Sequence, residues 1–179
     1  VDILLPYGYT NLWINTFHAF CDRILRDEAH NIGLDIGYKL MSESESVLFL
    51  RKNIFNLRLK LFKPSGNPIK FLDALLTHFS RLSDEDITPD EYIRWAGGQN
   101  PSEKEQYMEL ASAYKKYQEL KVAQSVMDFS DLISNTLKLF RTRKNILKRY
   151  QKQFEFILVD EFQDTNYAQN ELAILLAGD

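Results

Sequence analysis

The chain has 179 residues, of which 45% are hydrophobic and 26% are charged, a composition that excludes an intrinsically disordered protein. Its formal net charge of −3 excludes a surface that is basic all round, and no apolar run approaches the ~20 residues of a membrane-spanning helix. The single cysteine, Cys21, excludes an internal disulfide and favours a reducing, cytoplasmic setting.

The first predicted elements are a short strand and an amphipathic helix. Residues 12–16, LWINT, form an apolar run bounded by polar residues, which indicates a β-strand. From Phe17 to about residue 30, apolar side chains recur every three or four positions, which predicts a helix, and Gly33 marks its end. The chain starts without methionine and in the middle of a pattern, so we expect it to be a segment of a longer protein.

Residues from about 42 to 124 predict one helix after another, beginning with a helix over residues 42–62. Apolar residues recur at helical spacing, and prolines and glycines separate the segments. Each helix begins at a recognisable cap, where a side-chain oxygen can accept a hydrogen bond from a free backbone amide. The predicted caps are Ser42 with Glu45, Asn67 before Pro68, Thr88 before Pro89, and Ser102 with Glu105.

The last part of the chain returns to a mixture of helix and strand. Asp128 predicts the cap of a helix over residues 128–140, and residues 166–176 predict a final helix. Between these helices, five of the six residues 154–159 (FEFILV) are apolar, which is typical of a strand covered on both faces of a parallel sheet.

These patterns divide the chain into three parts. Strand and helix patterns occur at both ends, and only helices are predicted between them. The expected fold class is therefore mainly α, with an all-helical insertion at residues 34–124. Remnants of a parallel α/β core, at residues 1–33 and 125–179, flank the insertion.

Three acidic residues, Asp160, Glu161 and Asp164, follow the predicted strand at 154–159. Ligands of open α/β sheets bind at the carboxyl ends of the strands. Two neighbouring carboxylates repel each other, and a hard cation such as Mg²⁺ removes that repulsion. The pattern indicates a Walker-B-type site in which Asp160 holds Mg²⁺ and Glu161 orients or deprotonates an attacking water. The alternative is an exposed acidic turn after a core strand.

The segment VDEFQDTNYAQ, residues 159–169, resembles the second motif of the UvrD/Rep group of superfamily-one DNA helicases. Two further segments follow the family's order. TFHAFC at residues 16–21 is similar to the family's TFH-x-FC segment, and MDFSDL at residues 127–132 is similar to its (L/M)DF-x-DLL helix. The resemblance extends over essentially the whole chain. Specific motifs carry it at both ends, whereas in the middle only the size and the helical character agree with the family.

The resemblance implies a fold and an activity. Residues 1–33 and 125–179 would belong to the first RecA-like core domain, and residues 34–124 would form a helical insertion carried on it. The longer protein would couple ATP hydrolysis to 3′-to-5′ movement along single-stranded DNA and to duplex unwinding. Its cofactors would be ATP and Mg²⁺.

The resemblance also implies roles for individual residues. Asp160 corresponds to the Mg²⁺ ligand, and Glu161, beside the metal, corresponds to the catalytic base. Gln163 and Asp164 would link the nucleotide site to neighbouring motifs. A separate group would lie against single-stranded DNA: Thr16, Phe17 and His18.

Two stretches of the chain are basic. Residues 51–70 and residues 141–152 each contain six Lys or Arg and no acid. They are either solvated helix faces or surfaces that face phosphates. The resemblance implies that the insertion contacts duplex DNA near the fork, and the candidates are Arg51, Lys52, Arg58, Lys60 and Lys63. A second group, Arg141, Arg143 and Lys144, can instead be a solvated helix end.

No G-x-x-x-x-G-K-[ST] phosphate-binding loop occurs in the sequence. We therefore expect the chain alone to be inactive as an ATPase and to need the remainder of the same polypeptide as its partner. Two other functions stay open. The chain can be a DNA- or protein-binding module without catalysis, or a metal-dependent nuclease that uses Asp160, Glu161 and Asp164.

Overall fold

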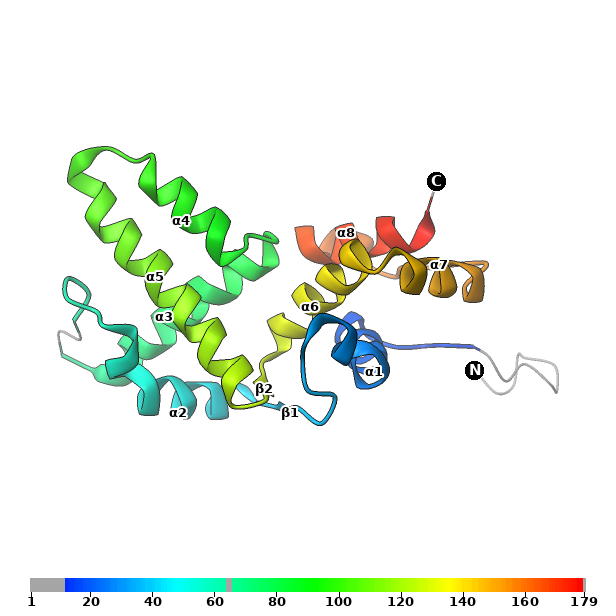
Figure 1. Cartoon of the computed structure of the whole chain (residues 1–179), viewed down its shortest axis with the longest axis horizontal. Helices are drawn as coiled ribbons and strands as arrows, with labels where there is room; N and C mark the ends of the chain where they lie inside the picture. Colours follow the sequence, from blue (N-terminus) through cyan, green and yellow to red (C-terminus); the bar gives the residue numbers. More distant parts are fainter. Residues whose placement is uncertain (1–11, 64–65, 179) are drawn as a thin grey trace.

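The computed structural model describes residues 12–63 and 66–178. This part of the chain is mainly helical, as predicted, and contains one two-stranded parallel sheet (Figure 1). None of its helices is long and apolar enough to cross a membrane. In chain order the elements are α1 (Phe17–Glu28), η1 (Ala29–Ile32), β1 (Lys39–Leu40), α2 (Glu43–Asn53), η2 (Ile54–Leu57), α3 (Pro68–Asp84), α4 (Pro89–Gly97), α5 (Pro101–Ala123), β2 (Val126–Met127), α6 (Phe129–Thr142), α7 (Lys144–Gln153), η3 (Phe162–Asp164) and α8 (Tyr167–Ala177).

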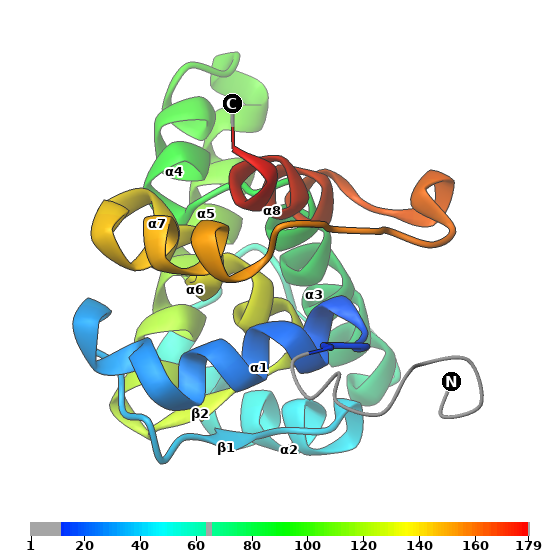
Figure 2. The same cartoon turned by 90° about the vertical axis from the view of Figure 1, so that its right-hand side faces the viewer.

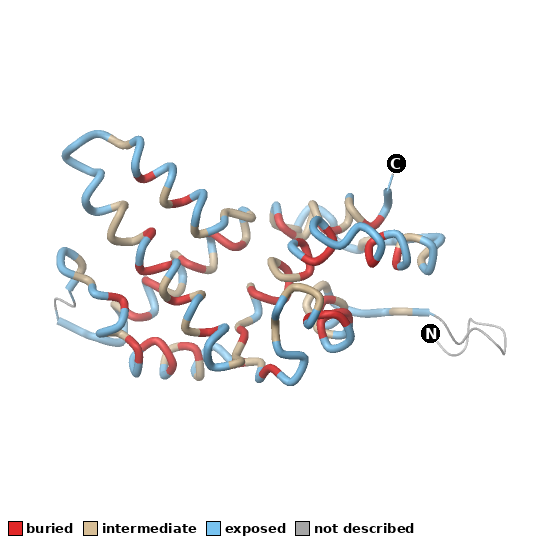
Figure 3. The backbone as a smooth tube through the Cα atoms, viewed as in Figure 1, coloured by how far each residue is buried: buried red, intermediate tan, exposed pale blue. Residues whose placement is uncertain are grey.

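The buried apolar side chains form two separate clusters. The terminal cluster draws on α1, α6, α7 and α8, with Leu137, Phe140 and Leu172 fully buried. In it, α6 lies between α1 on one side and α7 with α8 on the other (Figure 2). The middle cluster draws on α2, α3, α4 and α5, and includes the fully buried Leu50 and Tyr117. Figure 3 shows buried segments in both lobes, which is the signature of two cores rather than one.

The chain passes between the two clusters at β1 and β2. The two strands run in parallel, with Lys39 paired to Val126 and Leu40 paired to Met127. Tyr38 and Met127 are buried in the terminal cluster, whereas Met41 is buried in the middle cluster. The path out and the path back therefore lie side by side, and the middle lobe is inserted into the terminal lobe. The sequence patterns did not predict these short strands.

Most of the predicted helix caps are confirmed. Capping boxes form at Ser42, Thr88 and Asp128, and Asn67 accepts a hydrogen bond from the amide of Ile69. The capping box predicted at Ser102 and Glu105 is wrong, because α5 already begins at Pro101. Proline at the first helical position fixes φ in the helical range and loses no hydrogen bond, so the cap is Asn100 and the helix starts two residues earlier than predicted.

The helix predicted over residues 42–62 ends early. Helix α2 stops at Asn53, and after η2 the backbone of Arg58 is left-handed, with φ 54°. The carboxylate of Glu109 on α5 then accepts hydrogen bonds from the amides of Leu61 and Phe62 at 2.9 to 3.1 Å. A long-range partner for the backbone therefore replaces the helical one.

Both strands predicted for the core are wrong in this structure. Residues 12–16 and 154–159 are extended but pair with no other strand. Phe156 and Leu158 are 87% and 97% exposed. A parallel strand needs neighbouring strands for its amides and helices for its faces, and the described residues supply neither at this segment.

Candidate functional site

The acidic motif lies in the connection between α7 and α8, which projects from the rest of the molecule, at the right in Figure 2. The chain turns at Glu161, whose backbone is left-handed with φ 49° and ψ 42°. The Glu161 amide donates to the Asp160 carboxylate at 3.0 Å, and the Asp164 amide donates to the Glu161 carbonyl at 2.9 Å. A left-handed residue other than glycine is strained, and such residues gather at functional sites. The turn predicted here is confirmed.

The side chains of the motif point to solvent. Asp160, Glu161 and Asp164 are exposed, and none forms an ion pair within the described residues. The Gln163 side-chain amide donates to the Glu161 carboxylate and so orients it. Within residues 12–63 and 66–178, no three His, Cys, Asp or Glu side chains are close enough to hold one metal ion. The three acids therefore do not form the three-carboxylate centre that the nuclease hypothesis requires.

The donor chemistry of the motif fits a magnesium–nucleotide complex in part. Mg²⁺ takes one or two carboxylates and completes its shell with water and phosphate oxygens. Asp160 and Glu161 supply two adjacent, exposed carboxylates that no basic residue in the described chain neutralises. The sequence holds no phosphate-binding loop, so the cradle for the phosphates has to come from outside the chain.

The acidic motif is anchored to the middle lobe. Asn166 caps α8, and its side-chain amide donates to the carboxylate of Asp84, at the end of α3, at 2.7 Å. Burial raises the pKa of Asp84, and nearby His18 on α1 opposes that rise. Asp84 thus binds the segment after the acidic motif and lies near His18, in the segment that the resemblance places near single-stranded DNA. No local pattern predicted the hydrogen bond between Asn166 and Asp84, because the two residues are far apart along the chain.

Thr16, Phe17 and His18 have different surroundings. The Thr16 hydroxyl caps α1 by accepting a hydrogen bond from the Ala19 amide at 3.2 Å, and Phe17 is half-buried against the terminal cluster. The His18 ring lies edge-on to Phe129, with 5.7 Å between ring centroids. Burial lowers the pKa of His18, although Asp84 partly offsets this. The lowered pKa favours the neutral form of His18, and of the three it is the one that contacts Phe129, a residue that lines the cavity between the lobes.

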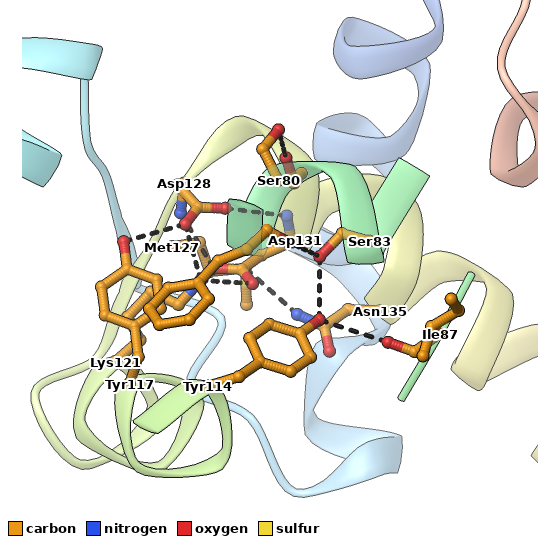
Figure 4. Close-up of polar contacts among 12 residues, drawn as sticks. Ser80, Ser83, Ile87, Tyr114, Tyr117, Lys121, Met127, Asp128, Asp131 and Asn135 are labelled. Atoms are coloured by element: carbon orange, nitrogen blue, oxygen red, sulfur yellow. Dashed lines mark hydrogen bonds and ion pairs between the residues drawn. The ribbon is translucent and has the colours of Figure 1, made fainter. Parts of the chain in front are cut away.

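This cavity has a volume of about 560 Å³ and lies where α2, α3 and α5 meet the start of α6. Most of the residues that line it have polar side chains, although apolar atoms make up the larger part of its wall, and Phe129 adds an aromatic ring that is partly exposed. The hydroxyls of Ser80 and Ser130 bridge the two lobes at 3.0 Å (Figure 4). The lining includes Ser80, Arg81, Asp84, Lys121, Phe129 and Ser130.

A buried ion cluster joins α5 to α6 beside the cavity (Figure 4). Lys121 is 2% exposed and donates to Asp128 at 2.6 Å and to Asp131 at 2.7 Å, while the Tyr117 hydroxyl donates to Asp128 at 3.1 Å. Burial and the Asp128 carboxylate raise the pKa of Asp131 to about 6. Burial alone would lower the pKa of Lys121, but the two carboxylates raise it. Asp128 and Asp131, the two acids of the MDFSDL segment, therefore both form ion pairs with Lys121.

The sequence analysis missed Lys121. A signal was available, because Lys121 continues the buried stripe that Tyr114 and Tyr117 form along α5. A lysine on the apolar face of a helix is buried only with anionic partners, and two acids follow within ten residues.

The two basic groups differ in their pairing. Arg51, Lys52, Arg58, Lys60 and Lys63 are all exposed, and none forms an ion pair within the described residues. In the second group, Arg141 pairs with Asp86 at 2.6 Å and with Glu171 at 3.2 Å, and the Arg143 guanidinium donates to the carbonyl of Asn31 at 2.8 Å. Arg141 therefore joins the terminal lobe to the loop after α3 in the middle lobe as well as to α8, and Arg143 binds η1, whereas the first group remains available to an anionic partner.

Comparisons with known proteins agree with the motifs. The family model described as UvrD/REP helicase N-terminal domain matches residues 4–179. An ATP-dependent DNA helicase PcrA from Bacillus subtilis is 33% identical over 180 residues, which cover 99% of this chain and 22% of that protein. The PcrA of Leuconostoc citreum is 35% identical over 169 residues, 93% of this chain and 21% of that protein. The chain thus spans about a fifth of the length of these relatives.

Proposed function

This chain belongs to the UvrD/REP helicase N-terminal domain family, and on that premise we propose that it is a segment of an ATP-dependent DNA helicase. Residues 1–33 and 125–179 contribute to a RecA-like core domain, and residues 34–124 form the helical insertion. Residues 1–11 lie outside the described part of the chain. In the longer protein, ATP hydrolysis drives 3′-to-5′ movement along single-stranded DNA and duplex unwinding.

One observation carries the proposal: an extended apolar segment with exposed side chains ends directly at two unpaired carboxylates. Phe156 and Leu158 are almost fully exposed in this segment, and the turn at Glu161 follows it. A strand added on each side would supply hydrogen-bonding partners for residues 154–159, and helices packed on the completed sheet would cover their side chains. Asp160 and Glu161 would then lie at the carboxyl edge of a parallel sheet, the usual place for a nucleotide.

Each side chain of the motif has one proposed role. Asp160 binds Mg²⁺, and the bound metal neutralises charge on the phosphates. Glu161 accepts a proton from the attacking water at its carboxylate. Gln163 holds that carboxylate through its amide, a contact already present in the structure. Asp164 lies one turn further on, in η3, and links the site to neighbouring motifs.

The DNA contacts of the proposal are not specific for sequence. Arg51, Lys52, Arg58, Lys60 and Lys63 bind phosphates of the duplex near the fork, which their exposure and lack of ion pairs support. Thr16, Phe17 and His18 lie close to the single strand. Phe17 acts by holding α1 in place, since its ring packs against the terminal cluster.

Replacing Glu161 with glutamine in the longer protein tests the proposal. We expect the variant to hydrolyse ATP about 10²- to 10⁴-fold more slowly, because a positioned general base contributes about that much. Binding of ATP and Mg²⁺ should persist, because Asp160 and the phosphate cradle remain. Glu105→Gln, an exposed carboxylate on α5, is the matched control and should keep the wild-type rate. Normal turnover in Glu161→Gln would refute the assigned role.

The five unpaired cations and the lack of a phosphate-binding loop in the sequence also support a second candidate, a DNA-binding module without catalysis. The two candidates differ in nucleotide dependence. A module binds DNA with the same affinity at every ATP concentration, in the chain and in the longer protein. The helicase couples the two ligands, so ATP changes the DNA affinity of the longer protein.

A further inference from the structure

The aromatic ring of Phe55 lies on the surface of the middle lobe. Phe55 is in η2, directly after α2, and is 91% exposed. This end of α2 lies at the opposite end of the molecule from α7 and α8 (Figure 1). A single exposed apolar residue is ordinary on a protein surface. Nearly complete exposure of a phenylalanine is costly, and this ring has unusual neighbours.

Completing the core sheet cannot explain the exposure of Phe55. Phe156 and Leu158 lie in an extended segment, and neighbouring strands would cover them. Phe55 lies instead on the outer face of a helical element, while Leu57, two residues later, is buried in the middle cluster. The ring therefore points away from the core of a lobe that is already packed.

The neighbours of Phe55 are cations. Arg51 and Lys52 precede it by four and three positions, in the last turn of α2, and Arg58 follows it by three, at the left-handed end of η2, so all three are close to the ring along the chain. All three are exposed and form no ion pair within the described residues. Residues 51–70 contain no acid at all. The patch is thus an aromatic ring between unneutralised positive charges.

The next part of the patch is held in place by α5. The Glu109 carboxylate accepts hydrogen bonds from the backbone amides of Leu61 and Phe62. Lys60 and Lys63 flank these two residues, and both are exposed to solvent. Burial by itself would raise the pKa of Glu109, but the amides of Phe62 and Leu61 lower it overall. Glu109 is therefore charged at neutral pH and is already engaged by backbone amides.

We propose that Phe55 is a base-stacking residue at the DNA fork: its ring stacks on the first unpaired base, while Arg51, Lys52 and Arg58 bind the phosphates on either side of that base, where the single strand leaves the duplex. This inference deepens the proposed function and rests on it. Every base offers a face to an aromatic ring, so the contact needs no sequence specificity. Cations beside an aromatic ring match the alternation of phosphates and bases along a single strand. A protein partner would need a strongly acidic surface around an apolar pocket.

The test measures binding of the 179-residue chain to a forked DNA with 2-aminopurine at the first unpaired position. Stacking on an aromatic ring changes the fluorescence of this base analogue. We expect Phe55→Ala to abolish the fluorescence change and to weaken binding about fivefold or more. Phe55→Trp should restore both. Leu48→Ala is the matched control, since Leu48 lies in α2, the helix directly before Phe55, and is 52% exposed.

Salt dependence separates the ring from the charges. Each phosphate contact to a single strand contributes about 0.7 to the slope of log affinity against log salt concentration. The double variant Arg51→Ala, Lys52→Ala should therefore lower the slope by about 1.4. Phe55→Ala should leave the slope unchanged and weaken binding equally at every salt concentration.

Three results would overturn the inference. If Phe55→Ala binds like wild type and keeps the fluorescence change, stacking is refuted, while salt-dependent binding would still support the DNA interface. If the wild-type chain binds no DNA even at low salt, the patch and the proposed DNA contacts of the insertion both fail. If Phe55→Ala lowers only the melting temperature of the longer protein, Phe55 is a contact between domains. The hydrolysis test with Glu161→Gln judges the helicase proposal independently of all three.

Discussion

Two pairs of acids, each within one of the short motifs of the chain, lie in opposite environments. Asp128 and Asp131 are enclosed and both pair with Lys121. Each carboxylate also accepts a hydrogen bond from the backbone amide of the other residue. Asp160 and Glu161 are exposed and form no ion pair within the described residues. The first pair already has every partner it needs, so it stabilises the junction between the lobes. The second pair has no cationic partner among the described residues, which leaves both carboxylates free for the Mg²⁺ that we propose they bind.

The largest expected effect breaks the enclosed pair. Lys121→Met should lower the free energy of unfolding by about 3–5 kcal/mol, because it leaves two buried carboxylates without a cation. The matched control is Lys116→Met on the exposed face of the same helix, where the partner is Glu119. The control should cost no more than about 1 kcal/mol. Urea unfolding of both variants measures the difference, and equal losses would mean that the enclosed cluster does not hold the lobes.

A smaller effect is expected on the pH dependence of stability, through the titration of Asp131 in the enclosed pair. Asp131 has its pKa raised to about 6, so the folded chain takes up this proton at higher pH than the unfolded chain does. The protonated form of Asp131 therefore favours folding, and its contribution grows as the pH falls from 7 to 5 and is lost as the pH rises through 6. Asp128, with its pKa lowered mainly by Lys121 against the effect of burial, acts oppositely at more acidic pH.

The variant Asp131→Asn shows how much the proton on Asp131 contributes to stability. Its amide cannot titrate, so wild type should gain about 1 kcal/mol of stability relative to the variant between pH 7 and pH 5. Urea unfolding of both proteins at pH 7, 6 and 5 measures the gain. A stability difference that stays constant over this range would show that Asp131 titrates normally.

The smallest effect is expected at the exposed pair. Asp160→Asn combined with Glu161→Gln should change the free energy of unfolding of the chain by less than about 0.5 kcal/mol, because no buried partner depends on either charge. Thermal unfolding without added Mg²⁺ measures this. A large loss would mean that these acids support the fold, and the contrast with Asp128 and Asp131 would disappear.

Sequence reasoning was accurate where a structure depends on neighbours along the chain. The caps at Ser42, Thr88 and Asp128 were predicted because a capping bond spans only three residues. The turn at Glu161 was predicted from local composition. The strands at residues 12–16 and 154–159 were wrong for this structure, because a strand exists only with partners that local sequence does not supply.

The sequence by itself determined the helical character of the chain, most of its caps, the acidic pair and the family, because these depend on short-range patterns. Only the tertiary structure decided which charged side chains are already paired and which are free to bind another molecule. It buried Lys121 between Asp128 and Asp131, joined Asn166 to Asp84, and left Phe55 exposed among unpaired cations. The physical reason is that pairing and burial depend on distances in space between residues far apart in the sequence, and local pattern carries no information about those distances.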